Sequence, residues 1–147
     1  MGLKEKLEQD VVTALKAKEP EKVSTLRMVL SAVKNESIAK RKELSEEETM
    51  IVVQREIKKR KESAEAFEKG GRTELSEAES AEANLLQQYL PEPLSETELE
   101  QIIKEAIEST GAESMKDMGK VISQVMAKAQ GKAEGKVVSE KVRQILS

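Results

Sequence analysis

The fold is decided by the stretch Tyr89-Leu90-Pro91-Glu92-Pro93-Leu94-Ser95-Glu96-Thr97-Glu98, in which a helix-stop signal is followed at once by a helix-start signal. Pro91 and Pro93 favour extended backbone before them, so a helix that arrives from upstream has to end here. Ser95 and Glu98 have the spacing of a capping box, in which each side chain accepts the backbone N–H of the other residue. We therefore expect a linker at residues 91–94, between a helical domain at 1–90 and a second one at 95–147.

Upstream of this linker, apolar residues recur every three or four positions in four stretches, as on the buried face of a helix. The turn Lys18-Glu19-Pro20 separates the first two stretches, and a second capping box at Ser45 and Glu48 opens the third. Gly70-Gly71 closes the third, and the fourth runs from about 73 to 90. Residues 1–90 are thus predicted to form about four helices. Their apolar faces carry Leu3, Leu7, Val11, Ala14 and Leu15; Val23, Leu26, Leu30 and Val33, with Ile38 and Leu44 further on; Met50, Val53, Ile57, Ala64 and Phe67; and Leu75, Ala78, Leu85, Leu86 and Tyr89.

Downstream of the linker the pattern shortens to three helices in roughly 50 residues, a size that is marginal for independent stability. Gly111 ends the first helix, and Ser114 is a candidate cap for the second. The stretch Gln130-Gly131-Lys132-Ala133-Glu134-Gly135-Lys136 is predicted to be a basic loop, followed by a last helix capped by Ser139. The apolar faces carry Leu99, Ile102, Ile103, Ala106 and Ile107; Met118, Val121, Ile122, Val125 and Met126; and Val138, Val142, Ile145 and Leu146.

Composition supports an all-α fold and excludes several kinds of chemistry. Phe67 and Tyr89 are the only aromatic residues, so the core has to be built from aliphatic side chains. The chain contains neither cysteine nor histidine, which excludes disulfides, thiol nucleophiles, His-based triads and His or Cys metal sites. No stretch approaches the roughly 20 apolar residues of a membrane span, and no signal-like segment opens the chain. We expect a cytoplasmic protein without membrane contact.

Positive charge is concentrated near the C-terminal end of a chain whose net charge is −3. Residues 112–147 carry seven Lys/Arg against four Asp/Glu. Two helix starts flanked by lysines would suit phosphate groups, and glycines would allow close approach of a ligand. The candidate nucleic-acid-binding residues are Lys116, Gly119, Lys120, Gly131, Lys132, Gly135 and Lys136, with Lys128 nearby. The alternative, which composition alone favours, is that the glycines are turn and cap residues and the lysines are merely solvated.

The other charged positions give less support for a binding or catalytic site. A second basic run, Arg55-Glu56-Ile57-Lys58-Lys59-Arg60-Lys61, has glutamates within helical ion-pairing distance, which favours an exposed, ion-paired helix face. No carboxylate pair lies in an apolar stretch that would shift its pKa for acid–base catalysis, and the nucleotide-binding loop motifs are absent. We predict no catalytic residues, no metal site and no cofactor, so an enzymatic activity of the chain by itself has no local support.

Several motifs resemble one family. Tyr89 to Ser95, then Asp117-Met118-Gly119-Lys120-Val121, then Gly131-Lys132-Ala133-Glu134-Gly135 are similar to the YqeY family. Leu26-Arg27-Met28, Asn35-Glu36, Arg55-Glu56-Ile57-Lys58 and the Phe67-to-Arg72 segment extend the resemblance over nearly the whole chain. Two positions depart from the pattern. Gln130 stands where a basic residue is usual, and Glu134 stands where aspartate is usual.

The resemblance implies a two-part helical protein whose C-terminal part is similar to the tail domain of the GatB subunit of tRNA-dependent amidotransferase. In that enzyme the tail assists tRNA binding, while the catalytic work lies in other domains. By this resemblance, the lysines and glycines at positions 116–136 are expected to face tRNA. The scarcity of aromatic residues implies contact with phosphates and RNA shape rather than base stacking.

Three functions follow as hypotheses. The first is a non-catalytic, tRNA-associated accessory protein whose partners are tRNA and a component of an aminoacylation or amidotransferase system. The second is a helical protein–protein interaction module in which the N-terminal helices dock a partner. The third, ranked last, is a component of a glutamine-dependent carbon–nitrogen ligase.

Overall fold

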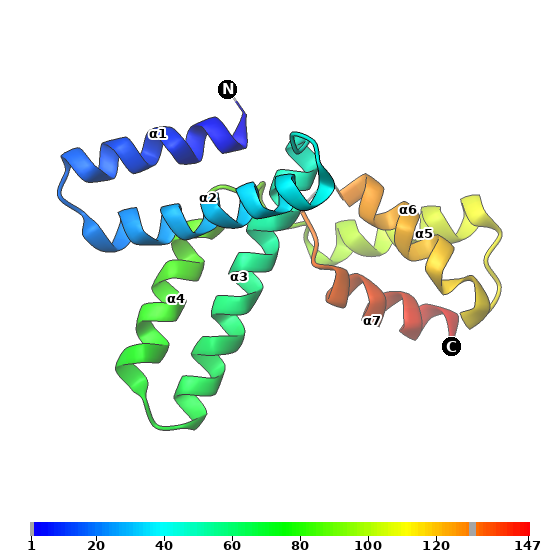
Figure 1. The fold of residues 1–147 in the computed structure, drawn as a ribbon. Coiled ribbons are helices and arrows are strands. Elements are labelled where there is room, and N and C mark those ends of the chain that lie inside the picture. The colour runs from blue at the N-terminus through cyan, green and yellow to red at the C-terminus, as the bar shows by residue number, and fades with distance from the viewer. Residues whose placement is uncertain (1, 130–131) are drawn as a thin grey trace. The chain divides into compact units, whose positions relative to one another are not determined.

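The computed structural model describes residues 2–129 and 132–147, and every regular element within these ranges is a helix (Figure 1). The all-α class predicted from the sequence is therefore confirmed. The elements are α1 (Leu3–Lys16), α2 (Pro20–Lys40), α3 (Glu46–Lys69), α4 (Thr73–Gln87), α5 (Glu96–Thr110), the short 3₁₀ helix η1 (Met115–Asp117), α6 (Met118–Ala129) and α7 (Gly135–Leu146).

The chain folds into two compact units, Met1–Leu90 and Pro91–Ser147. The first unit contains α1 to α4, and the second contains α5, η1, α6 and α7. Each unit has its own cluster of buried apolar side chains. They are therefore described separately below.

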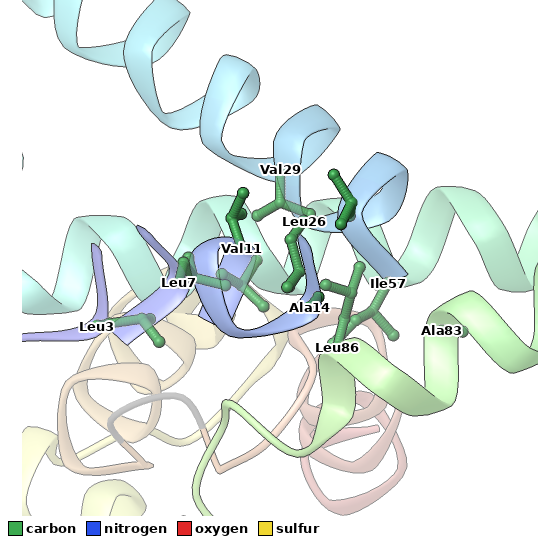
Figure 2. Close-up of a cluster of buried hydrophobic side chains, with 11 residues drawn as sticks. Leu3, Leu7, Val11, Ala14, Leu26, Val29, Ile57, Ala83 and Leu86 are labelled. Carbon is green, nitrogen blue, oxygen red and sulfur yellow. The ribbon is translucent and has the colours of Figure 1, made fainter. Parts of the chain in front are cut away.

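In the first unit, α1 pairs with α2 and α3 pairs with α4, and all four helices contribute to one core. Leu7, Leu26 and Leu86 are fully buried there. Since burial of a leucine side chain contributes about 2 kcal/mol, these three side chains matter greatly to a small domain that lacks aromatic residues in its centre. Figure 2 shows how the core is assembled from Leu7, Val11 and Ala14 of α1, Leu26 and Val29 of α2, Ile57 of α3, and Ala83 and Leu86 of α4.

Local signals set the helix ends of this unit as predicted. Pro20 is the first residue of α2. The Ser45 hydroxyl accepts the Glu48 N–H at 3.1 Å, and the Glu48 carboxylate accepts the Ser45 N–H at 3.0 Å. These bonds, with Lys40 and Lys42 close by, lower the pKa of Glu48 to about 2. Gly71 adopts the left-handed conformation, with φ of +74°, that the tight α3–α4 turn requires.

The second unit is a three-helix arrangement around buried aliphatic side chains. Its centre consists of Ile103 from α5, Val121 and Val125 from α6, and Val138 and Val142 from α7. The predicted capping box at Ser95 and Glu98 is present, with the Ser95 hydroxyl 3.1 Å from the Glu98 nitrogen. Gly111 ends α5 with a φ of +68°. The Leu94 N–H donates to the Lys132 carbonyl at 2.8 Å, which joins the segment before α5 to the segment before α7.

Two of the predicted caps in this unit are wrong. The Ser114 side chain makes no capping bond, because η1 intervenes before α6 and the Asp117 carboxylate instead accepts the Glu113 N–H at 3.1 Å. Ser139 lies inside α7, which begins four residues earlier at Gly135. The earlier start allows Val138 to occupy the same buried helix face as Val142, one turn apart.

The predicted basic loop at 130–136 is correspondingly shorter than expected. Gly135 and Lys136 form the first turn of α7, whereas Lys132 lies in the connection. Gln130 and Gly131 lie outside the described residues.

Candidate nucleic-acid interface

The four candidate lysines lie in two pairs at the starts of α6 and α7. Lys116 is in η1 and Lys120 in the first turn of α6. Lys132 precedes α7 and Lys136 is in its first turn. All four side chains are exposed.

The structure does not bring these two pairs together into one cluster. The Lys132 N–H donates to the carbonyl of Ala129, which holds Lys132 at the C-terminal end of α6, whereas Lys116 and Lys120 lie at its N-terminal end. Because α6 has 12 residues, its two ends are about 18 Å apart. A ligand that contacts both pairs has to be an extended one.

Ion pairing distinguishes the candidate lysines from Lys128 and Lys141 of this unit. Lys128 lies 3.6 Å from Glu105, and Lys141 lies 2.9 Å from Glu96 and 3.8 Å from Glu100. The hydrogen bond between Lys141 and Glu96 raises the pKa of the lysine and lowers the pKa of the glutamate. Within the described part of the chain, no ion pair engages Lys116, Lys120, Lys132 or Lys136. These four cations are therefore available to an external anion.

Carboxylates of the chain itself accompany both helix starts. Asp117 bonds to a backbone N–H just before α6, and Glu134 is the residue that precedes α7. A carboxylate of the chain next to a helix N-terminus already interacts favourably with the helix dipole and competes with an incoming phosphate. Binding of an anion therefore has to depend on the lysine side chains more than on bare helix N-termini. Asp117 belongs to the motif quoted from the sequence, but its bond to the Glu113 N–H was not predicted.

The candidate glycines lie in open positions. A Cβ atom added at Gly119 or Gly135 would meet nothing within 4 Å. Neither glycine has a positive φ, so the backbone does not require glycine there. Their absent side chains leave the surface beside Lys120 and Lys136 uncovered. The third candidate glycine, Gly131, lies outside the described residues.

Positive charge in the second unit is concentrated between Lys116 and Arg143, a segment that contains α6, most of α7 and the residues just before each of them. Residues 91–147 as a whole carry eight Lys/Arg against ten Asp/Glu. The acidic excess comes from the segment between Glu92 and Glu108, which has six glutamates and a single lysine, Lys104. The unit therefore carries separate acidic and basic regions, and α6 and α7 supply the basic one.

The second basic run, on α3, is largely occupied by interactions within the protein. Arg55 pairs with Glu36 of α2 at 3.2 Å, and Lys59 pairs with Glu56 at 3.2 Å. These pairs agree with the predicted ion-paired face. The prediction is wrong for Arg60, whose side chain is only 6% exposed and bonds to Glu56 at 3.1 Å. A run of charges in the sequence does not reveal which member is covered by a neighbouring helix.

The described residues contain no helix that is long and apolar enough to cross a membrane. They also contain no group of three side chains placed to hold a metal ion.

Comparison with known proteins finds several relatives of this chain. An uncharacterized protein of Schizosaccharomyces pombe is 28% identical over 89 residues, which is 60% of this chain and 72% of that protein. The "Altered inheritance of mitochondria protein 41, mitochondrial" of Vanderwaltozyma polyspora is 31% identical over 125 residues, 80% of this chain and 65% of the relative. The protein of the same name in Kluyveromyces lactis is 38% identical over 84 residues, 56% of this chain and 45% of the relative. The chain thus matches only part of each relative, and less than two thirds of the length of the two mitochondrial proteins.

The family comparison covers nearly the full length of both units. The model for "Yqey-like protein" matches residues 4–146, a range that includes all seven α-helices of the described residues except the first residue of α1. The motifs around the linker and at the starts of α6 and α7 fall within this match. The chain belongs to the YqeY family.

Proposed function

We propose that this protein is a non-catalytic accessory protein that contacts the phosphate backbone of tRNA through the basic region of α6 and α7. The observation that supports this most is the set of four exposed lysines that no described carboxylate engages. The choice of ligand rests on the resemblance, inferred from the sequence motifs, of this part of the chain to a tRNA-assisting tail domain. A component of an aminoacylation or amidotransferase system is the protein partner that the proposal implies.

The spacing of the lysines suits an extended polyanion. Two pairs at opposite ends of α6, about 18 Å apart, can reach different phosphates of one RNA. A small anion would contact one pair at most. Residues 91–147 contain no aromatic residue, so the proposed contact uses charge and backbone shape and not base stacking.

Catalysis is no part of the proposal. The relatives from Vanderwaltozyma polyspora and Kluyveromyces lactis carry names that refer to mitochondria, and phosphate contact is compatible with a cytoplasmic or a mitochondrial setting.

The test is tRNA binding by the full chain at about 50 and 200 mM salt. Four phosphate contacts would weaken binding about 100-fold between these concentrations, because each contact releases close to one counterion. A variant with Lys116, Lys120, Lys132 and Lys136 changed to Gln is expected to lose most of this affinity and of its salt dependence.

The matched control removes the same charge from the first unit by changing Lys4, Lys16, Lys34 and Lys58 to Gln. These lysines are also exposed, so a general electrostatic attraction would be weakened equally in both variants. Equal weakening, or no binding of tRNA at 50 mM salt, would contradict the proposal.

A further inference from the structure

The first unit has an open groove beside the C-terminal end of α1. It has a volume of about 760 Å³ and lies along the face of α2 that carries Ser24, Arg27, Met28 and Ser31. Leu15 of α1 and Met28 of α2 line it and are about half exposed, at 49% and 54%. Helix α2 thus has apolar side chains on two faces. One packs into the core, and the other borders this groove.

The lining of the groove carries unpaired positive charge. Lys18 and Arg27 form no ion pair with any residue in the described ranges. Glu19 also lines the groove, and its carboxylate lies 4.0 Å from the Lys22 ammonium. An apolar groove bordered by two free cations complements a partner that presents apolar side chains next to carboxylates.

A buried guanidinium adjoins the same groove. Arg60 of α3 uses Nη1 to bond the Glu56 carbonyl at 3.0 Å and the Glu56 carboxylate at 3.1 Å. Its Nη2 meets only the Met28 Sδ, a weak acceptor, at 3.9 Å, and its buried Nε has no hydrogen-bond partner. Nε and Nη2 form one edge of the guanidinium, the edge that binds a carboxylate through two parallel hydrogen bonds.

This unsatisfied edge is unusual for a native protein. A buried donor without a partner is destabilising, and such groups are rare unless a ligand or a functional state satisfies them. Met28 joins the two features because it lines the groove and also contacts Nη2. Methionine is flexible, so it can move aside while it keeps an apolar contact with a ligand.

We propose that this groove docks an acidic amphipathic helix of a partner protein. Apolar side chains of that helix pack against Leu15 and Met28, one carboxylate pairs with Arg27 or Lys18, and another reaches the free edge of Arg60. The half-exposed Leu15 and Met28 favour a peptide over nucleic acid, whose phosphates and sugars offer little apolar surface to cover them. A second copy of this groove is disfavoured as the occupant, because Lys18 and Arg27 would then face like charges.

The test measures binding of designed helical peptides to the full chain by fluorescence anisotropy. Three peptides of about 18 residues place leucines at every third or fourth position and glutamates beside them, each in a different register. Each of these Glu peptides has two matched controls. All glutamates are replaced by glutamine in the Gln peptide and by lysine in the Lys peptide. The wild-type chain is expected to bind at least one Glu peptide about tenfold more tightly than its Gln counterpart, a difference near 1.4 kcal/mol.

Charge reversal in the groove provides the specific control. The Lys18→Glu/Arg27→Glu variant should lose this preference and bind the Lys peptide instead, while Lys34→Glu, an exposed position of α2 outside the groove, should behave like the wild type. If no Glu peptide binds, or if the double variant binds the Glu peptides as well as the wild type does, the proposal is overturned. If a short RNA duplex displaces the peptide and its own binding weakens in the double variant, the groove is a nucleic-acid site and the proposal is overturned as well.

Arg60 has a readout of its own. In a chain labelled with ¹⁵N, the Arg60 Nε–H resonance should shift on addition of a Glu peptide and remain unchanged with the Gln peptide. Arg60→Lys keeps the positive charge but removes the two-donor edge. This variant should bind the Glu peptide more weakly and the Gln peptide as the wild type does, and its circular dichroism spectrum should be unchanged. An unshifted Nε–H resonance at saturating Glu peptide would show that Arg60 does not receive the carboxylate.

Discussion

Tyr89 and Asp10 form the clearest long-range contact between single polar residues. The Tyr89 hydroxyl donates to the Asp10 carboxylate, which joins the segment after α4 to α1. Lys6 lies 3.1 Å from the same carboxylate. Burial, followed by the bond to Asp10, raises the pKa of Tyr89 above its ordinary value of 10. Desolvation opposes ionisation of Asp10, but the Tyr89 bond and Lys6 together hold the pKa of Asp10 below its ordinary 3.8.

Replacement of Tyr89 by Phe should therefore destabilise the chain in a pH-dependent manner. A lowered carboxyl pKa stabilises the fold above the unfolded-state pKa and loses that effect as pH falls through the folded-state pKa. We expect a loss of about 1 kcal/mol at pH 7, and a smaller difference from the wild type below pH 3.8. Urea unfolding at several pH values measures it. A difference that stays constant down to pH 2 would show that the effect is one of packing and not of the Asp10 contact.

At the scale of single helices, capping bonds decide where α5 begins. The Ser95 hydroxyl accepts a backbone N–H of α5, whereas the Ser114 side chain makes no capping bond before α6. Ser95→Ala is expected to cost about 1 kcal/mol of stability, and Ser114→Ala less than about 0.5 kcal/mol. Chemical denaturation followed by circular dichroism compares the two. Equal losses would mean that the cap at Ser95 contributes nothing specific.

The same elements show what could be read from the sequence and what could not. The capping boxes at Ser45 and Ser95 depend on residues three positions apart, so local spacing predicted both. The start of α7 depends instead on burial of Val138 against other helices, and for that reason Ser139 was the wrong choice. A cap signal in the sequence competes with tertiary packing, which local spacing does not contain.

In the candidate site, too, some features could be predicted from the sequence and others could not. Exposure of the four lysines follows from their charge, since lysine is almost never fully buried unless it is paired, and was predictable. Pairing of Lys141 with Glu96, 45 positions away, depends on how α7 packs against α5, and sequence spacing does not reveal such a partner. Burial of Arg60 against Met28 of α2 was hidden for the same reason.

At the scale of the whole molecule, the two separate cores raise the question of whether the predicted domains at 1–90 and 95–147 fold independently. If each core suffices, fragments 1–90 and 91–147 should both be helical and unfold cooperatively on their own. The smaller fragment should be the less stable of the two, because a shorter chain buries a smaller fraction of its surface. Circular dichroism and two-dimensional amide NMR spectra of each fragment, compared with the full chain, make the test. A fragment with a collapsed amide spectrum would show that its unit depends on the other.

Tyr89 also determines how this molecule can be observed. It is the only tyrosine, and the chain has no tryptophan, so all tyrosine fluorescence comes from one phenol ring beside Asp10. The second unit contains no aromatic side chain and therefore contributes no aromatic fluorescence. Tyrosine emission reports on the first unit alone, while far-ultraviolet circular dichroism reports on both. Without any added label, a denaturation curve recorded by the two signals together separates loss of one unit from loss of the other.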